Sequence, residues 1–176
     1  RHVSRMTFPS PAMVANVEFT GWHTGYPDAP VRILPDTCRE LPWEETVFFL
    51  GEFAEKAEVL CPRGVLRKAI EKAESMGFRG MAAVEYEFFV FDETPKSIRS
   101  KNYRGLQPIA PGNFGYSVIR NSGDSELYET ILKTAEVMDF PIEGLHEECG
   151  PGVLEAAIAV AAVLSAADKA AMFKTF

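Results

Sequence analysis

One segment of the sequence, Met81 to Phe91, constrains the fold more than any other. Its β-branched and aromatic residues favour a buried strand, yet the run also contains Glu85 and Glu87. Residues two apart on a strand point to the same face, so both carboxylates project together from an apolar segment. Such a strand needs neighbouring strands, and its paired negative charge needs either solvent or a positive partner.

The surrounding sequence predicts further helices and strands. A tight turn is expected at Gly150-Pro151-Gly152, and the capping-box-like pattern from Ser165 to Asp168 predicts the start of a closing helix. Apolar periodicity predicts amphipathic helices at 66–73 and 125–138, and strands at 142–148 and 153–159. This order, on an antiparallel or mixed sheet, predicts an α+β fold.

The N-terminal stretch has a different character. Prolines and glycines punctuate short extended pieces such as Met13–Phe19 and Val31–Leu34. We interpret residues 1–60 as an incomplete β-rich region, because these strands have few partners within the chain. Residues 61–176 then form a second region, in which helices and strands alternate.

Composition and cysteine usage narrow the possible partners. The formal net charge of −7 argues against binding to a nucleic-acid backbone, which needs a basic face. Cys38, Cys61 and Cys149 form no disulfide framework and favour a reducing compartment. The apolar run Ala156–Ala167 is too short to span a membrane, and no signal-peptide pattern opens the sequence. We therefore expect a cytoplasmic protein with neither nucleic-acid nor membrane partners.

A second acidic group flanks the glycine turn. Glu148 precedes the turn and Glu155 follows it among apolar residues. If the turn folds the two segments back on each other, the carboxylates of Glu148 and Glu155 converge on one point. Several carboxylates from separate strands, without a thiol or histidine cluster, are typical of a site for Mg²⁺ or Mn²⁺. Such ions often hold nucleotide phosphates during phosphoryl transfer.

Each of these residues also has a simpler interpretation. Glu85 and Glu87 are equally consistent with an edge strand whose polar face is merely solvated. Glu147 is expected at the surface without a function. His146 is a single histidine, so a structural hydrogen bond is expected of it rather than metal ligation.

Two motifs resemble the glutamine synthetase family. The segment 83–92 resembles the family's strand E-x-E-F-F-x-F, and 146–155 resembles its H-x-E-x-G-P-G-Q-x-E, with the two glutamates at the same separation. Further matches follow in the family's order along nearly the whole chain: Pro35-Asp36, Leu41-Pro42-Trp43, Cys61-Pro62-Arg63, Phe114-Gly115-Tyr116, Ala166-Ala167-Asp168-Lys169 and Phe173-Lys174. Each match alone is weak, whereas the ordered set is specific.

The resemblance implies a carbon–nitrogen ligase that depends on ATP and on Mg²⁺ or Mn²⁺. Such an enzyme joins the γ-carboxylate of glutamate to ammonia or a small amine through γ-glutamyl phosphate. By the same resemblance, Glu87, Glu148 and Glu155 are expected to bind the metal that orders glutamate, and Glu85 the second metal, which bridges the ATP phosphates. Tyr116 is expected to help bind the amine, with Glu148 bordering the same pocket, so these two are the expected catalytic residues.

The resemblance also implies an architecture and an assembly. Residues 1–60 correspond to the C-terminal part of a small β-grasp domain, and residues 61–176 to the first half of a catalytic domain with a curved antiparallel sheet. The family's subunits form rings of the dodecamer type, so a homo-oligomeric ring is expected. The remaining ligands of the second metal, the phosphate-binding arginines and a flap glutamate would lie beyond Phe176, so we expect the chain to be part of a longer protein.

One departure from the family pattern bears on the substrate. Val153 stands where the motif has glutamine, which removes a polar contact near the first metal and favours a subfamily that uses another amine. The family's amine-activating aspartate is not identifiable in the N-terminal region. An alternative hypothesis is a catalytically inactive relative kept as a structural or regulatory ring protein, although all four metal-ligand glutamates remain. A generic metal-dependent hydrolase ranks third, because it would not need the ordered flanking motifs.

Overall fold

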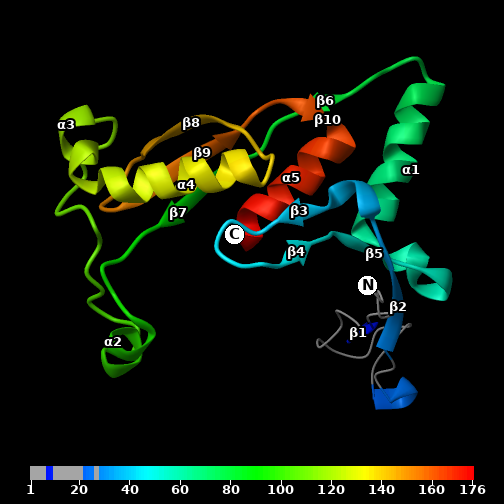
Figure 1. Ribbon diagram of the computed structural model, residues 1–176, viewed down its shortest axis with the longest axis horizontal. Coiled ribbons are helices and arrows are strands. Elements are labelled where there is room, and N and C mark those ends of the chain that lie inside the picture. Colours follow the sequence, from blue (N-terminus) through cyan, green and yellow to red (C-terminus); the bar gives the residue numbers. More distant parts are fainter. Residues whose placement is uncertain (1–6, 10–21, 26–27) are drawn as a thin grey trace. The chain divides into compact units, whose positions relative to one another are not determined.

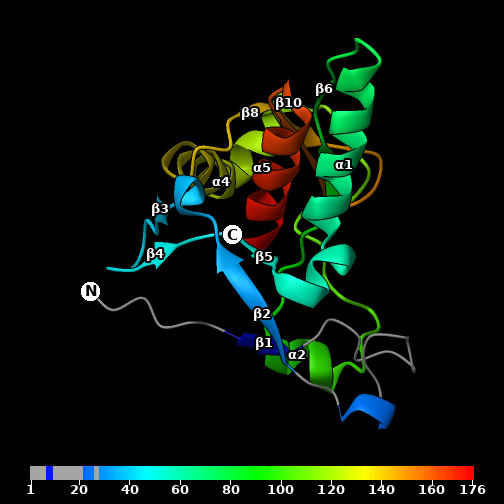
Figure 2. The same cartoon turned by 90° about the vertical axis from the view of Figure 1, so that its right-hand side faces the viewer.

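The chain is described by a computed structural model over residues 7–9, 22–25 and 28–176, and it divides into two compact units, 1–80 and 81–176 (Figures 1 and 2). The extended piece expected at Met13–Phe19 lies outside the described residues. The domain boundary expected after residue 60 falls inside the first unit and stays a prediction.

The described residues of the first unit form short antiparallel strands, 3₁₀ turns and one long helix (Figure 2). β1, β2 and β5 form a three-stranded sheet, while β3 pairs with β4. The helix α1 includes the predicted 66–73 segment and begins at a proline, whose fixed φ suits the first helical position. The elements are β1 (Thr7–Pro9), η1 (Trp22–Thr24), β2 (Asp28–Ile33), η2 (Pro35–Thr37), β3 (Arg39–Glu40), β4 (Val47–Phe48), β5 (Gly51–Phe53), η3 (Glu55–Leu60) and α1 (Pro62–Ser75).

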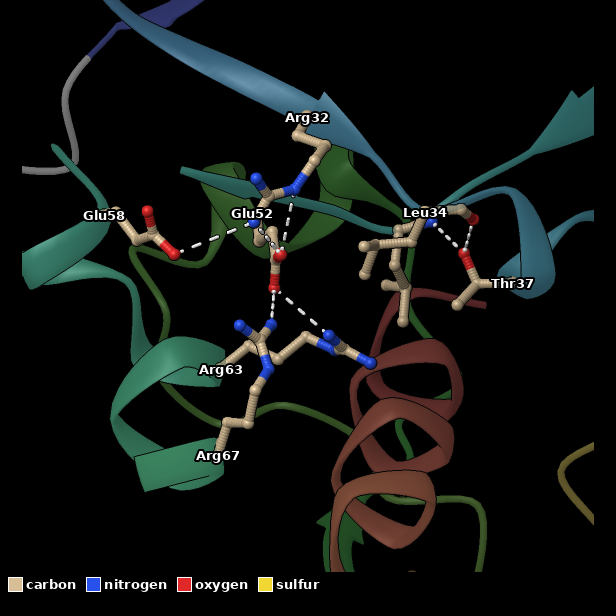
Figure 3. Close-up of polar contacts among 8 residues, drawn as sticks. Arg32, Leu34, Thr37, Glu52, Glu58, Arg63 and Arg67 are labelled. Carbon is tan, nitrogen blue, oxygen red and sulfur yellow. Dashed lines mark hydrogen bonds and ion pairs between the residues drawn. The ribbon is translucent and has the colours of Figure 1, made fainter. Parts of the chain in front are cut away.

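The carboxylate of Glu52 joins three elements of this unit (Figure 3). Its side chain on β5 is only 4% exposed. It accepts hydrogen bonds from Nε (3.2 Å) and Nη2 (2.5 Å) of Arg32 on β2, and from Arg63 (3.1 Å) and Arg67 on α1. Burial alone would raise the pKa of Glu52, but the hydrogen bonds from Arg32 and Arg63 and the charge of Arg67 outweigh it and lower that pKa. Glu52 therefore stays ionised at the centre of three guanidinium groups.

The second unit contains a three-stranded antiparallel sheet in the order β7–β9–β8 and a two-stranded pair, β6 with β10 (Figure 1). The predicted helix at 125–138 and the strands at 142–148 and 153–159 are present, with ends shifted by about one residue. The elements are β6 (Met81–Ala82), β7 (Glu85–Phe89), α2 (Pro95–Ser100), α3 (Val118–Asn121), η4 (Ser122–Asp124), α4 (Ser125–Val137), β8 (Ile142–Glu147), β9 (Val153–Ile158), β10 (Ala161–Ala162) and α5 (Val163–Thr175).

The core of this unit lies between the sheet and the helices α4 and α5. Tyr86 and Phe88 of β7 point to this side, and a pocket lined by residues of β7, α4 and α5 lies there. The ring of Tyr86 stacks on Phe173 of α5 with centroids 5.1 Å apart, and its hydroxyl donates to the carbonyl oxygen of Ala170 (3.0 Å). Phe173 also meets Phe140 edge-on, with centroids 5.8 Å apart. The opposite face of β7 therefore carries Glu85 and Glu87 away from the core.

Two local predictions are wrong. The single strand expected at Met81–Phe91 divides into β6 and β7, because β6 pairs with β10 instead of continuing the three-stranded sheet. The closing helix begins at Val163, and its N-cap, Ala162, makes no side-chain cap, so no capping box forms at Ser165. The chain enters α5 directly from β10, and this pairing fixes where the helix starts.

Two expected absences concern cysteines and membranes. The three cysteines, which lie among the described residues, are all free. Within the part of the chain that the structure describes, no helix has the length and apolar character needed to cross a membrane.

Candidate functional site

Three charged or titratable side chains form a row across the three-stranded sheet. Glu155 on the central strand β9 lies opposite Glu87 of β7 on one side and opposite His146 of β8 on the other. Glu85 pairs with Ala157 and, being two residues from Glu87, projects from the same face. The face of the sheet turned away from α4 and α5 thus gathers the expected metal-ligand residues of β7 and β9.

Glu148 and Glu155 come together across the glycine turn, as the turn interpretation expects. Carboxylate oxygens of both residues and a ring nitrogen of His146 all lie within 4.8 Å of one another. Nδ1 of His146 is 3.8 Å from Oε1 of Glu148, and Nε2 is 3.8 Å from Oε1 of Glu155. The imidazole therefore lies between the two carboxylates.

The ring of His146 makes the kind of contact that the sequence interpretation expects, and it also lies beside two carboxylates. The only hydrogen-bond contact of its ring among the described residues joins Nδ1 to the carbonyl oxygen of Glu147, at 3.4 Å. The period of two could have indicated the arrangement, since His146 and Glu148 lie two residues apart at the end of one strand. A neutral imidazole in this place can complete a ligand set that the carboxylates begin.

Electrostatics at Glu155 favour a bound cation. Burial is the largest cause of the raised pKa of Glu155, and the charges of Glu85, Glu148 and Glu87 add to it, while His146 opposes them. The cluster thus carries more negative charge than its surroundings compensate. Carboxylate oxygens with one imidazole nitrogen, and no thiolate, are a donor set that suits a hard divalent cation such as Mg²⁺ or Mn²⁺. The residues present therefore fit the metal that the sequence motifs imply.

Tyr116 reaches the same cluster from the loop before α3. Its hydroxyl donates a hydrogen bond to Oε1 of Glu148, and its ring lies against His146 with centroids 5.1 Å apart. The hydrogen bond is the largest cause that raises the pKa of Tyr116 to about 12 and also the largest that lowers the pKa of Glu148. Glu148 is therefore held in its ionised form. Tyr116 is 62% exposed, so this polar corner is accessible.

The positions of Glu85 and Glu87 agree in part with the interpretation of a solvated edge strand. Glu85 and Glu87 are exposed, and β7 is an edge strand of the sheet as far as the described residues extend. A solvated edge therefore describes their location. It does not account for the register that places Glu87 directly opposite a second carboxylate, that of Glu155, because such like-charge pairs are destabilising without a cation.

Glu147 contradicts the expectation of a surface residue. It is only 4% exposed, because it alternates with its neighbours on β8 and so points to the face covered by α4. In the sheet it lies in one row with Leu154 and Phe88. A residue type that is almost always solvated is here part of the core.

Val153, the departure from the family motif, lies on the site face of β9. It pairs across the sheet with Phe89 and is 4% exposed, whereas Phe89 is 63% exposed and stacks on Phe91 with centroids 5.9 Å apart. The position beside the row of Glu87 and Glu155 is therefore apolar. A glutamine in place of Val153 would offer hydrogen bonds there.

Gly152 fixes the turn that brings Glu148 and Glu155 together, and we expect Gly152→Ala to destabilise the protein. Its φ is +69°, and an added Cβ would lie 2.8 Å from the carbonyl oxygen of Val90. Because that oxygen is backbone, the expected loss is about 2 kcal/mol or more. Urea unfolding followed by circular dichroism measures it. Gly123→Ala is the matched control, since its Cβ would meet nothing within 4 Å. Equal stability of the two variants would contradict the argument.

Comparison with known proteins gives a consistent result. The family model for the catalytic domain of glutamine synthetase matches residues 59–176. Type-1 glutamine synthetase 2 of Dictyostelium discoideum is 42% identical over 166 residues, covering 90% of this chain and 31% of that protein. Glutamate–isopropylamine ligase of a Pseudomonas species is 33% identical, covering 92% of this chain and 36% of that protein. Gamma-glutamylethanolamide synthetase GlnA4 of Streptomyces coelicolor is 32% identical, covering 89% of the chain and 35% of the relative.

Solved structures share the fold. A GmaS/ADP complex superposes with a TM-score of 0.71 at 18% identity, covering 97% of this chain and 38% of that one. The Plasmodium falciparum glutamine synthetase gives a TM-score of 0.65 at 16% identity, with the same coverage of 97% and 38%. The chain spans about a third of the length of the curated relatives that it matches.

Proposed function

The chain belongs to the glutamine synthetase family, and we propose that the protein carrying it is an ATP-dependent ligase that joins glutamate to ammonia or a small amine. The proposed reaction has two steps. The γ-carboxylate of glutamate attacks the γ-phosphate of ATP, giving γ-glutamyl phosphate and ADP. The amine then attacks the γ-carbonyl carbon and displaces phosphate, so that an amide bond forms and the amine loses a proton.

One observation carries the proposal: the same carboxylate, that of Glu148, belongs to the group formed with His146 and Glu155 and also contacts Tyr116. This carboxylate lies within 4.8 Å of the ligand atoms of His146 and Glu155, and it also accepts the hydrogen bond from Tyr116. A cation site for phosphoryl transfer and a site for a positively charged amine would therefore adjoin. A ligase that passes an activated acyl group to an amine needs this adjacency.

The ligands of the first cation are proposed to be Glu87, Glu148 and Glu155, with Glu85 serving a second cation. When bound, Mg²⁺ or Mn²⁺ would neutralise charge on the phosphoryl group that is transferred. By holding these cations, the carboxylates of the sheet face would fix where the phosphates and the substrate glutamate can bind. The ring nitrogens of His146 are each 3.8 Å from an oxygen of Glu148 or Glu155, so the imidazole is available as a further ligand of the first cation.

Amine binding is proposed for Glu148 and Tyr116. The lowered pKa of Glu148 keeps its carboxylate ionised at neutral pH, so it attracts an ammonium ion or a protonated amine. The hydroxyl of Tyr116 fixes Oε1 of that carboxylate and the backbone N–H of Cys149 donates to Oε2 (3.0 Å), and each oxygen keeps a lone pair that can accept an N–H bond from the amine. Holding the amine beside the acyl phosphate raises its effective concentration for the second step.

The apolar pair of Val153 and Phe89 supports a substrate amine that carries carbon. It lines the site face beside Glu87 and Glu155, where the motif's glutamine would have been polar. Relatives with matching sequence include enzymes named for isopropylamine and ethanolamide products. We further propose that residues 1–60 belong to a β-grasp domain and that the protein assembles as a homo-oligomeric ring.

An amine panel tests the function. The full-length protein is incubated with ATP, Mg²⁺ and glutamate, and phosphate release is measured with ammonium, methylamine, ethanolamine, isopropylamine or putrescine. We expect release that requires glutamate together with an amine. A carbon-bearing amine should exceed ammonium by about tenfold in kcat/KM, the effect of one methylene group in an apolar pocket.

Reactions without glutamate serve as the control for simple ATP hydrolysis. Phosphate release that is independent of glutamate would contradict the ligase and favour a hydrolase. Absence of release with every amine, while Mg²⁺ still binds, would favour a non-catalytic relative.

A further inference from the structure

The buried Glu147 has no role in the proposed chemistry, and its setting calls for an explanation. It is 4% exposed on the helix-covered face of β8, and no lysine or arginine pairs with it among the described residues. A carboxylate in such a place is unfavourable unless hydrogen bonds compensate for the lost water. Its hydrogen-bond partners therefore indicate what it does.

One partner comes from the end of α3. With its amide nitrogen facing them, Asn121 donates to Oε2 of Glu147 (3.0 Å) and to the carbonyl oxygen of Ser117 (3.2 Å). The hydroxyl of Tyr128 on α4 is buried and has no hydrogen-bond partner in the described part of the chain. Burial, followed by the charges of Glu147 and Asp124, raises the pKa of Tyr128 to about 12. The side chain of Glu147 thus interacts with one polar residue of α3 and one of α4.

The backbone of Glu147 holds the same loop at its other end. The N–H of Tyr116 donates to the carbonyl oxygen of Glu147 (3.2 Å). Next to it, a Cβ on Gly115 would lie 3.0 Å from the carbonyl oxygen of Glu148, so the loop lies close against the end of β8. Tyr116 has a φ of +66°, a conformation that a residue with a side chain keeps only when its surroundings impose it.

Apolar packing contributes little to this anchoring. Val118 and Ile119, in the four-residue helix α3, are 80% and 86% exposed. A helix of this length is not stable alone in water. Hydrogen bonds to β8, rather than a buried apolar face, therefore hold the segment 113–121 in place.

We propose that Glu147 is a positioning residue that holds Tyr116 against Glu148 by anchoring the segment 113–121 to β8. The last residue of β8 and the residue that follows it would then serve the same site from opposite faces. Glu148 contacts the amine on the open face, and Glu147 fixes the tyrosine loop from the core side. This inference rests on the proposed function only for the identity of the amine; the anchoring itself does not depend on it.

Amide hydrogen exchange of the full-length protein tests the anchoring directly. In Glu147→Ala, peptides covering 113–121 should exchange about tenfold faster or more, the effect of losing a hydrogen bond to a charged group, while β9 keeps its protection. Glu147→Gln should exchange as the wild type does, because its amide oxygen still accepts from Asn121. Glu143→Gln, at an exposed position of the same strand, is the matched control. If Glu147→Ala fails to fold, Asn121→Ala removes the same hydrogen bond and should give the same result.

Steady-state kinetics test the consequence for the amine. Glu147→Ala should raise KM for the amine about tenfold, with KM for glutamate and ATP unchanged, and Glu147→Gln should restore it. In a Tyr116→Phe background, Glu147→Ala should add little, because the two changes remove one interaction. Unchanged exchange in 113–121, an equal rise of all three KM values, or additive effects would overturn the proposal. If the wild type shows no ligase activity at all, the proposed function fails while the exchange result still decides the anchoring.

Discussion

Replacing Glu155 with glutamine should lower the affinity of the protein for Mg²⁺ or Mn²⁺ by about 100-fold or more and abolish most glutamate-dependent turnover. Glu155 is the central member of the row that Glu87 and His146 complete, and it is within 4.8 Å of Glu148. Isothermal titration of the metal measures the affinity, and phosphate release measures the turnover. Glu136→Gln, at an exposed position in α4, is the matched control.

In the absence of metal, Glu155→Gln should raise the thermal stability of the protein. An acid whose pKa is raised on folding contributes stability below its ordinary pKa and loses that contribution as the pH rises through the raised value. Glu155 is such an acid, mainly because of its burial and the charge of Glu85. At pH 7 without metal, Glu155→Gln should therefore unfold at a higher temperature than the wild type, and the difference should vanish near pH 4.

Added Mg²⁺ should reverse this order, since a ligand that binds only the folded state stabilises it. The wild type should gain thermal stability from the metal and Glu155→Gln should not. An identical response of both proteins to Mg²⁺ would remove Glu155 from the ligand set.

Glu52→Gln should cost about 3 kcal/mol of the free energy of unfolding, because it leaves three guanidinium groups without their shared carboxylate. The estimate is at the low end for buried pairs, since the side chains of Arg32, Arg63 and Arg67 are 50%, 22% and 34% exposed (Figure 3). Urea unfolding at pH 7 measures the loss. Glu58→Gln is the control: its carboxylate is 3.8 Å from Arg32 and 49% exposed, so its loss should cost under about 1 kcal/mol.

The contribution of Glu52 to the stability of the folded protein also depends on pH. Because its pKa is lowered on folding, its contribution is complete above the ordinary value of 4.5 and is lost as the pH falls through the lowered one. Wild type and Glu52→Gln should therefore converge in stability in strong acid. A constant difference down to that range would mean that the side chain acts through packing rather than through charge.

Local patterns were sufficient for the helix α1 of the first unit and for much of the second unit. Apolar periodicity predicted the helices α1 and α4 and the strands β8 and β9, and a turn was predicted at the glycines between these strands. The spacing of Glu85 and Glu87 on one strand face also follows from sequence alone. These features depend on residues that lie within one turn or one strand of each other. Such short-range relations can be predicted from a single sequence.

Features that depend on distant partners were not predictable in the same way. The strand β6 ends at Ala82 because it pairs with β10. In this pairing Ala82 lies opposite Ala161, almost 80 residues further along the sequence. Glu147 was expected at the surface because no local sequence pattern indicates that residues of α3 and α4 cover it. His146 was assigned a structural role because its two carboxylate neighbours converge on it only after the turn has formed.

The placement of Glu155 on the central strand bears on how the sheet finds its alignment. A slip of β9 by one residue would turn Glu155 toward α4 and α5 and expose Leu154 and Ala156, both fully buried in the native pairing. The misaligned sheet would bury an ion and lose core contacts at once. Glu155, which makes the metal-free native state less stable at neutral pH, therefore also disfavours the shifted pairing of β9. Substitutions that relieve its charge repulsion should reduce the free-energy difference between the correct and the shifted pairing.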